Sequence, residues 1–174
     1  CEPEIEDLQT LLNSMGAQVK GGGSPVITID GVNRLGGATH DVIPDRIEAG
    51  TFICAAAITN GDVTIHDFPH DQLLAVSDRL EAIGVRVNRI DPNQDASACS
   101  VQVTCPRRLE PIMFTTQPFP GFPTDLQAQL MALLCFASGN SIVVEKIYPE
   151  RFMHVPELNR MGAQLVRQGP TVVV

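Results

Sequence analysis

One pattern occurs three times along this chain, and it limits the possible folds more than any other feature. Each copy reads as the end of a helix, a glycine in the C-terminal capping position and then an alternating strand. The copies occupy residues 12–19, 80–87 and 158–165. Repeats at intervals of this size are typical of stacked supersecondary units that share one core. The pattern therefore predicts a fold made of repeated units.

A second correspondence shows which elements lie between these copies. Pro44 begins an Ala-rich helical stretch that leads to the strand 63–65, and Pro123 begins a similar stretch that leads to the strand 142–144. The two copies lie 79 residues apart. The predicted unit is strand, helix, strand, helix, strand, strand, or βαβαββ. Crossovers between parallel strands in such units are right-handed, so we expect some of the strands to be parallel.

The chain contains two complete units, at about 38–104 and 112–174, and the tail of a third at 1–30. The helices 47–58 and 125–138 carry apolar residues on nearly every side, so both should be deeply buried at the centre of the fold. Two other helices carry a single apolar face, at residues 5–15 and 73–83. The predicted fold class is α/β, with repeated units and central helices.

The composition disfavours several functional classes. The 174 residues carry a formal net charge of −8 and form no basic stripe, which argues against nucleic-acid binding. No run of about 18 apolar residues occurs, so a membrane span is not expected. The first residues lack the features of a signal peptide, and the five cysteines form no C-x-x-C pair and no zinc spacing. We therefore expect a cytoplasmic protein with reduced cysteines and no metal.

Three segments stand out within the repeats. They read PDRIEAGTF at 44–52, FPTDLQAQ at 122–129, and RFMHVPEL at 151–158 followed by RMGA at 160–163. In sequence and order they resemble the enolpyruvyl transferase family, and the resemblance covers nearly all of the chain. It implies an inside-out α/β barrel, with helices inside and sheets outside, of which this chain holds a part. The expected division is the tail of the first family domain at 1–43 and two repeat units of the second domain at 44–174.

Within the family, the segments look most like the branch that acts on UDP-N-acetylglucosamine. The resemblance implies transfer of the enolpyruvyl group of phosphoenolpyruvate to the 3-hydroxyl of UDP-N-acetylglucosamine, the first committed step of peptidoglycan synthesis. The expected partners are these two small molecules, and no metal or organic cofactor is implied. Roles in cell wall biogenesis, cell shape and cell division would follow. Two alternatives stay open: a shikimate-pathway enolpyruvyl transferase, and a non-catalytic α/β repeat scaffold.

The resemblance also implies that this chain is an internal piece of a protein more than twice as long. The missing N-terminal and C-terminal parts of the same protein would then be its structural partners. The basic residues that clamp phosphoenolpyruvate in the family belong to segments absent here, and none of the five cysteines matches the family's reactive loop cysteine. We therefore expect the isolated chain to be inactive.

Asp125 is the main catalytic and substrate-binding candidate, and the residues alone leave two interpretations open. Thr124 and Gln127 form a T-x-x-Q capping box, and an acid in the first turn of a helix is favoured by the helix dipole. The matching position in the first repeat is Arg46, so a carboxylate there is not needed to build the repeat. In the family, the acid of this motif is the base that takes the proton from the sugar hydroxyl, and the resemblance implies this role for Asp125.

Three further residues are expected to contact substrate. By the resemblance, Ile147 would touch the nucleotide sugar through its backbone. Arg46 and Arg151 would lie near the cleft between domains, with Arg151 the better candidate for facing phosphoenolpyruvate. The alternative for Arg151 is a surface salt bridge to Glu150 or Glu157, since charges at the ends of elements are usually solvated or paired.

Overall fold

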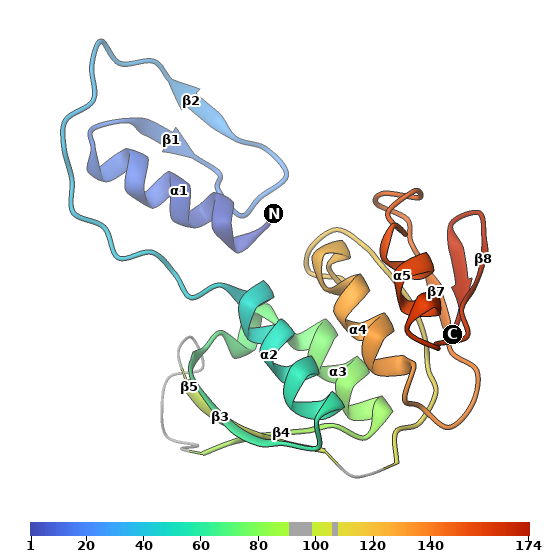
Figure 1. Cartoon of the computed structure of the whole chain (residues 1–174). Coiled ribbons are helices and arrows are strands. Elements are labelled where there is room, and N and C mark those ends of the chain that lie inside the picture. The colour runs from blue at the N-terminus through green and yellow to red at the C-terminus, as the bar shows by residue number, and fades with distance from the viewer. Residues whose placement is uncertain (91–98, 106–107) are drawn as a thin grey trace. The chain divides into compact units, whose positions relative to one another are not determined.

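The three copies of the repeated pattern take the same conformation in the structure, which is a computed structural model (Figure 1). It describes residues 1–90, 99–105 and 108–174. The helices that open the pattern are α1 (Pro3–Ser14), α3 (Leu74–Ile83) and α5 (His154–Arg160). The glycine after each helix has a positive φ, namely 97° at Gly16, 104° at Gly84 and 101° at Gly162. Residues with a side chain rarely adopt this conformation, which explains the glycine in every copy.

The same backbone hydrogen bond closes all three helix ends. At 2.9–3.1 Å it joins the amides of Ala17, Val85 and Ala163 to the carbonyl oxygens of Leu12, Leu80 and Leu158. This bond is typical of the Schellman motif. In the first and third copies an asparagine side chain also exchanges two hydrogen bonds with the following strand, Asn13 with Val19 and Asn159 with Leu165. The repeat inferred from the sequence is therefore confirmed as a structural repeat.

The first unit of the structure, Cys1–Pro44, is α1 followed by a two-stranded hairpin. Strands β1 (Gln18–Lys20) and β2 (Thr28–Asp30) pair antiparallel. The sequence predicts a buried face on α1, but no residue of this helix is buried, and Val19 is the sole core residue of the unit. The prediction is wrong for the unit by itself, because one helix and one hairpin cannot enclose a hydrophobic core.

The second unit, Asp45–Val174, contains both longer repeats. The elements of the first are α2 (Arg46–Ile58), β3 (Asp62–Phe68), a 3₁₀ turn η1 (His70–Gln72), α3, β4 (Arg86–Arg89) and β5 (Cys99–Thr104). Its three strands form an antiparallel sheet in the order β3-β5-β4. The strand predicted before α2 is not formed, since residues 38–44 have no strand assigned. A strand needs a neighbour to take its backbone hydrogen bonds.

The second repeat has the full βαβαββ order that the sequence predicts. Its elements are β6 (Met113–Thr115), a 3₁₀ turn η2 (Thr124–Leu126), α4 (Gln127–Leu134), β7 (Ile142–Val144), α5, β8 (Val166–Gln168) and β9 (Thr171–Val173). The sheet order is β6-β7-β9-β8, with β6 and β7 parallel and the other pairs antiparallel. The order β7-β9-β8 matches β3-β5-β4, so the two repeats share one topology.

Helices α2 and α4 pack against each other at the centre of the second unit, between the two sheets (Figure 1). A side chain at Gly50 of α2 would meet Leu126 Cδ1 at 2.5 Å, so the absence of a side chain allows this close approach. Gln129 Nε2 of α4 also donates to Thr51 Oγ1 at 3.0 Å across the contact. The prediction of two central helices is confirmed.

Two details of these helices differ from the sequence prediction. A 3₁₀ turn replaces the first residues of the helix expected at 125–138, and α4 ends at Leu134. Neither helix is buried on every side, since Phe52 is 55% exposed and Phe136, just beyond α4, is 62% exposed. The two sheets and the helix–helix contact cover only part of each helix surface.

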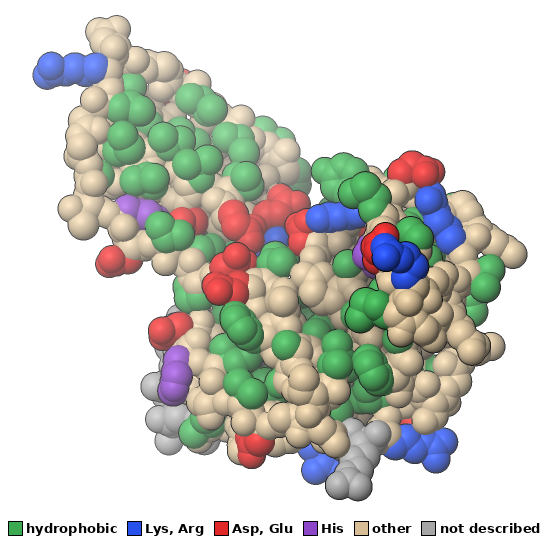
Figure 2. All heavy atoms as spheres, in the orientation of Figure 1, with side chains coloured by type: hydrophobic (Ala, Val, Ile, Leu, Met, Phe, Trp, Pro, Cys, Tyr) green, Lys and Arg blue, Asp and Glu red, His purple; other side chains and the backbone are tan. Residues whose placement is uncertain are grey.

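The two sheets differ in the polarity of their outer faces, although their topology is the same. Apolar residues lie side by side across all four strands of the second-repeat sheet and are 37–62% exposed, namely Met113, Ile142, Val173 and Val166. In the first-repeat sheet, a row that likewise crosses all three strands is polar and consists of Asp62, Thr104 and Arg86. Figure 2 shows that apolar side chains also reach the surface of both units on the face in view.

The contact at Gly50 generates a stability prediction. Gly50→Val should lower the free energy of unfolding by about 1–3 kcal/mol, because the new side chain would overpack the contact with the buried Leu126. Ala55→Val, at an exposed position of the same helix, is the control and should cost less than about 1 kcal/mol. Urea unfolding followed by circular dichroism measures both. Equal losses in the two variants would contradict the packing explanation.

Candidate active site

Asp125 is presented to solvent by a loop that is itself anchored in the core. It lies in η2, directly after the Pro-rich stretch 118–123. Phe122 of this stretch is buried, with its ring 4.6 Å from the ring of Phe114 on β6, and its carbonyl oxygen accepts from the Gln117 amide at 2.9 Å. The Asp125 side chain nevertheless keeps 52% of its surface exposed. The local sequence thus holds the backbone in place and leaves the carboxylate accessible.

Arg151 reaches Asp125 from the loop between β7 and α5. Its Nη1 lies 2.7 Å from Asp125 Oδ1 and also donates to Thr124 Oγ1 at 3.2 Å. The Arg151 side chain is 42% exposed. Ion pairs as exposed as this one contribute about 0–1 kcal/mol to stability. An incoming ligand can therefore take the place of either partner at little cost to the fold.

The surface salt bridges considered for Arg151 are not formed. Glu150 pairs instead with Arg167 at 2.6 Å, and Glu157 pairs with Arg160 at 2.7 Å. The side chain of Arg151 is directed to the residues that open η2.

This pair rests on a buried acid that the sequence analysis did not single out. Glu145 directly follows β7 and is 0% exposed. Its Oε1 accepts hydrogen bonds from Thr116 Oγ1 (2.7 Å) and from the amides of Ile147 (2.7 Å) and Tyr148 (3.0 Å). Its Oε2 accepts from Thr124 Oγ1 (2.9 Å) and Gln127 Nε2 (3.4 Å). We call these six residues the Glu145 cluster.

The donors of the cluster keep Glu145 ionised. Burial by itself raises the pKa of Glu145, but the hydrogen bonds from the Tyr148 amide, the Thr116 hydroxyl and the other donors outweigh it, so the pKa lies below its ordinary value. At neutral pH the group is a carboxylate, which can only accept hydrogen bonds. The single signal in the sequence for this role was the position of the acid, directly after a buried strand and two residues before Ile147.

The capping box predicted for Thr124 and Gln127 does not form. No side chain caps η2 or α4. Both side chains turn to Glu145 instead, and Gln127 Nε2 also donates to the Arg151 carbonyl oxygen at 3.2 Å. The prediction is wrong because a buried carboxylate from β7 competes for the same donors and binds them more strongly than a local cap would. The capping interpretation of Asp125 finds no support in this geometry.

The first repeat begins its helix in the ordinary way. There Asp45 caps α2, accepting from the amides of Ile47 at 2.7 Å and Glu48 at 3.2 Å. The first repeat therefore caps the amides at the start of its helix with a side chain, whereas no side chain caps η2 or α4 in the second repeat.

The other two predicted residues lie at different depths. Ile147 belongs to the cluster and is half-buried. Its amide binds Glu145, so a ligand contact through its backbone would fall to the carbonyl oxygen. Arg46 is 6% exposed, with its guanidinium 5.4 Å from the ring centroid of Phe119 in the loop before Asp125. The structure thus brings Asp125, Ile147 and Arg151 together, and buries Arg46 against the supporting loop.

His154 lies on the inner side of the site and contributes to packing. Its Nε2 is 3.3 Å from Met131 Sδ on α4. Burial, and then the positive charge of Arg151, lower the pKa of His154 from its ordinary value. The imidazole is therefore neutral at neutral pH.

The structure offers no sign of a metal centre in the part of the chain that it describes. Among those residues no group of three or more His, Cys, Asp or Glu side chains is placed to bind a metal ion. Burial raises the pKa of the Cys54 thiol to about 12, so this cysteine is unreactive. No described helix is long and apolar enough to cross a membrane.

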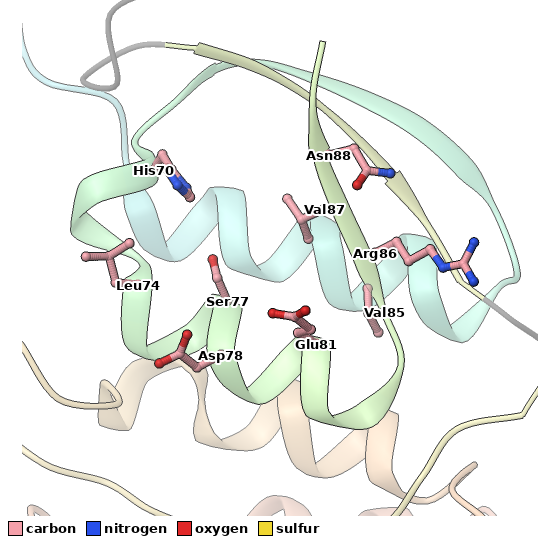
Figure 3. A pocket seen from close by; sticks show the side chains of 9 residues that line it. All are labelled: His70, Leu74, Ser77, Asp78, Glu81, Val85, Arg86, Val87 and Asn88. Atoms are coloured by element: carbon pink, nitrogen blue, oxygen red, sulfur yellow. The ribbon is translucent and has the colours of Figure 1, made fainter. Parts of the chain in front are cut away.

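A separate hollow lies between α3 and β4 (Figure 3). Its lining includes Asp78, Glu81 and Arg86, so it carries charges of both signs. None of the four predicted site residues lines it. This hollow is distinct from the candidate site around Glu145.

Comparison with known proteins identifies the family. A family model described as EPSP synthase (3-phosphoshikimate 1-carboxyvinyltransferase) matches residues 1–173. The chain belongs to this family. Among its curated relatives are the UDP-N-acetylglucosamine 1-carboxyvinyltransferases of Novosphingobium aromaticivorans and Hyphomonas neptunium, 49% and 50% identical. These matches cover 99% of this chain but 39% and 40% of the relatives, so the chain spans about two fifths of their length.

Solved structures of the family show the same fold. The enolpyruvyl transferase NikO from Streptomyces tendae matches all of this chain and 40% of its own, with a TM-score of 0.80 and 26% identity. EPSP synthase from Acinetobacter baumannii matches 97% of this chain and 38% of its own, with a TM-score of 0.55 and 15% identity, which shows the fold alone. The predicted fold class, a partial α/β fold of the enolpyruvyl transferase kind, is confirmed.

The lowered pKa of Glu145 predicts how stability depends on pH. Such a carboxyl group stabilises the fold above its unfolded pKa, ordinarily 4.5, and this contribution is lost as the pH falls through the folded-state value. Glu145→Gln should therefore be less stable than the wild type at neutral pH, and its stability should fall less steeply between about pH 5 and pH 2. Urea unfolding across this range is the measurement.

Glu157→Gln removes an exposed acid from the same repeat and serves as the control. Its stability should follow the pH dependence of the wild type. A Glu145→Gln curve parallel to the wild-type curve would show that the cluster does not depend on the ionised form.

Proposed function

We propose that the chain is part of a UDP-N-acetylglucosamine 1-carboxyvinyltransferase. Such an enzyme transfers the enolpyruvyl group of phosphoenolpyruvate to the 3-hydroxyl of UDP-N-acetylglucosamine, in the first committed step of peptidoglycan synthesis. The observation that carries the proposal is the pair of Asp125 and Arg151 at an anchored loop, linked to the Ile147 backbone through the carboxylate of Glu145, which binds both Thr124 and the Ile147 amide. The chain that contains this site is 49–50% identical to proteins that bear this name.

The acceptor has to be argued separately, because the family model bears the name of EPSP synthase. Identity to the relatives named for UDP-N-acetylglucosamine is 49–50% over 99% of this chain. The EPSP synthase of Acinetobacter baumannii shares 15%. This difference favours a UDP-sugar acceptor over a shikimate-type acceptor.

Asp125 suits the role of general base in this transfer. Its carboxylate is exposed and held by an anchored loop, which is the arrangement that proton transfer from a bound hydroxyl requires. Asp125 would take the proton of the 3-hydroxyl as the sugar oxygen adds to C2 of phosphoenolpyruvate, and C3 would gain a proton from an acid in the segments outside this chain. Loss of phosphate from C2 and of a proton from C3 of this tetrahedral intermediate then restores the vinyl group.

The neighbouring residues would bind substrate around this base. Arg151, with an exposed guanidinium that already binds one carboxylate, would face the anionic phosphoenolpyruvate. The Ile147 carbonyl oxygen would contact the nucleotide sugar, because its amide is engaged by Glu145. Arg46 would reach substrate only if the loop that carries Phe119 moves, because the side chain is buried against that loop.

The rest of the enzyme would come from segments outside this chain, which spans about two fifths of its relatives' length. We assign residues 1–43 to the first domain and 44–174 to two repeats of the second. Ile5 and Leu8 of α1 are 38% and 48% exposed, as expected for a helix that packs on such segments. The complete enzyme would act in the cytoplasm, without nucleic acid or membrane as partner, and would serve cell wall biogenesis and through it cell shape and division.

The role of Asp125 is tested by Asp125→Ala in the full-length protein. A positioned general base contributes about 10²–10⁴-fold to rate, so kcat should fall by this factor while the fold stays intact. Phosphate release in the presence of both substrates measures turnover, and circular dichroism measures folding. Asp78→Ala, which removes an acid from the separate hollow, should keep wild-type kcat. Near-normal turnover of Asp125→Ala would contradict the proposed role of Asp125 as the general base.

The same assay separates the alternatives. Phosphate release with shikimate 3-phosphate in place of UDP-N-acetylglucosamine would identify the shikimate-type enzyme. Binding of UDP-N-acetylglucosamine without any phosphate release would identify a non-catalytic scaffold.

The isolated 174 residues should release no phosphate above a blank. Catalysis at a site between two domains needs groups from both walls, arranged before the reaction around the developing charge. Turnover by the isolated chain would mean that the absent segments are dispensable or that the proposed chemistry is wrong.

A further inference from the structure

We propose that Glu145 is a positioning residue, which from its buried site sets the mutual placement of Asp125, Arg151 and the Ile147 backbone. Its effect on the reaction rests on the function proposed above. The geometry from which it is inferred does not depend on that function.

Glu145 holds two separate loops at the same time. Its Oε1 binds the amides of Ile147 and Tyr148 and so fixes the loop that leads from β7 to Arg151. Its Oε2 binds Thr124, which lies 21 residues earlier in the chain and immediately precedes Asp125. One carboxylate therefore determines the distance between two loops. One carries Asp125, the predicted base, and the other carries Arg151, which is predicted to bind phosphoenolpyruvate.

The cluster also fixes the direction of each hydrogen bond. Because Glu145 can only accept, the single hydroxyl proton of Thr124 is directed to Oε2 at 2.9 Å. The Thr124 oxygen is then left to accept from Arg151 Nη1 at 3.2 Å, and the same nitrogen binds Asp125 at 2.7 Å. Gln127 is oriented in the same way, since its Nε2 faces two acceptors, Glu145 and the Arg151 carbonyl oxygen.

The first repeat shows that its topology does not require such an acid. At the 79-residue offset the position of Glu145 is held by His66, which is exposed and bonds Ser100 Oγ at 3.0 Å. The position of Thr124 is held by Asp45, which caps its own helix. The first repeat thus builds the same three-strand order without a buried carboxylate among its described residues.

Stability alone does not account for the cluster either. A buried charge adds little net stability compared with a well-packed apolar residue. Gln127 Oε1 is moreover buried without a hydrogen-bond partner among the described residues. Polar arrangements that the fold does not need, and that leave a buried group unsatisfied, are typical of functional sites.

The first experiment reads the geometry in the 174-residue chain by NMR. In Glu145→Gln the new amide can turn its oxygen to the Ile147 and Tyr148 amides, but its nitrogen then faces the donors Thr124 and Gln127. We expect the Ile147 and Tyr148 amide protons to stay protected from exchange and the Arg151 guanidinium signals to move. Unchanged Arg151 signals would overturn the proposal.

The second experiment measures kinetics in the full-length protein. Misplacement of a catalytic group by about 1 Å can cost about 100-fold in rate, so Glu145→Gln and Thr124→Val should each lower kcat by about 10- to 100-fold. Thr124→Ser keeps the hydroxyl and should recover most of kcat. The Glu145→Gln/Thr124→Val double variant should be no worse than either single variant, because residues that act as one unit are not additive.

Ser141→Ala is the matched control. Ser141 is also fully buried, immediately precedes β7 and accepts a hydrogen bond from the Ile112 amide at 3.2 Å, but in the described part of the chain it makes no hydrogen bond to the cluster. It should lower stability and leave kcat unchanged. A kcat loss in Ser141→Ala equal to that in Glu145→Gln would mean that general loosening, and not positioning, explains the effect.

The two experiments separate the two proposals. A wild-type full-length protein without carboxyvinyl transfer would reject the proposed function, and the NMR result would still decide the role of Glu145. An active wild type with an equally active Glu145→Gln variant would reject the positioning role and leave the function standing.

Discussion

The contact between α2 and α4 is the constraint on which the second unit depends. Both helices are largely apolar, and most of their buried residues lie in the core of this unit. Gly50 leaves the space into which Leu126 packs, and Leu126 is 1% exposed. Leu126 is also the neighbour of Asp125 in η2, so the same contact that closes the core fixes the backbone of the candidate base. The packing of the core and the position of Asp125 therefore depend on the same contact.

The second support of the site comes from the sheet. Glu145 follows β7 and accepts hydrogen bonds from the loop on its own side and from the start of the helix opposite. No side chain caps η2. The Asp125 carboxylate is therefore not consumed by backbone amides, and it remains available to Arg151 or to a ligand.

The comparison of the two repeats separates what the fold requires from what the site requires. Both repeats share their strand order and the glycine that ends their second helix. They differ at the start of the first helix. Asp45 caps α2 in one repeat, whereas in the other no side chain caps η2 or α4, and Thr124 and Gln127 bind Glu145. The shared topology therefore does not require a side-chain cap at this position.

The repeat, its glycines and the two central helices could be predicted from the sequence, because each depends on local properties. A positive φ requires glycine wherever the chain turns in this way, and apolar periodicity reports burial within a single helix. Local reasoning also named Asp125 and Arg151 as candidates, through their motifs. It could not place them 2.7 Å apart, since residues 26 positions distant meet only through the packing of other elements.

The failed capping box and the unnoticed Glu145 have one common cause. An acid at the end of a strand is normally solvated, and Thr124 with Gln127 is normally a cap, as long as only neighbours in the chain compete for their hydrogen bonds. Tertiary packing removed water from Glu145 and brought four donor residues besides Gln127 to its oxygens, from the residue after β6, from η2 and from its own loop. The strength of a hydrogen bond to a buried charge then outweighed the local preference. The motifs of the sequence therefore identify candidate residues of this site. Their hydrogen-bond partners depend on which groups are buried together, and only the tertiary structure decides this.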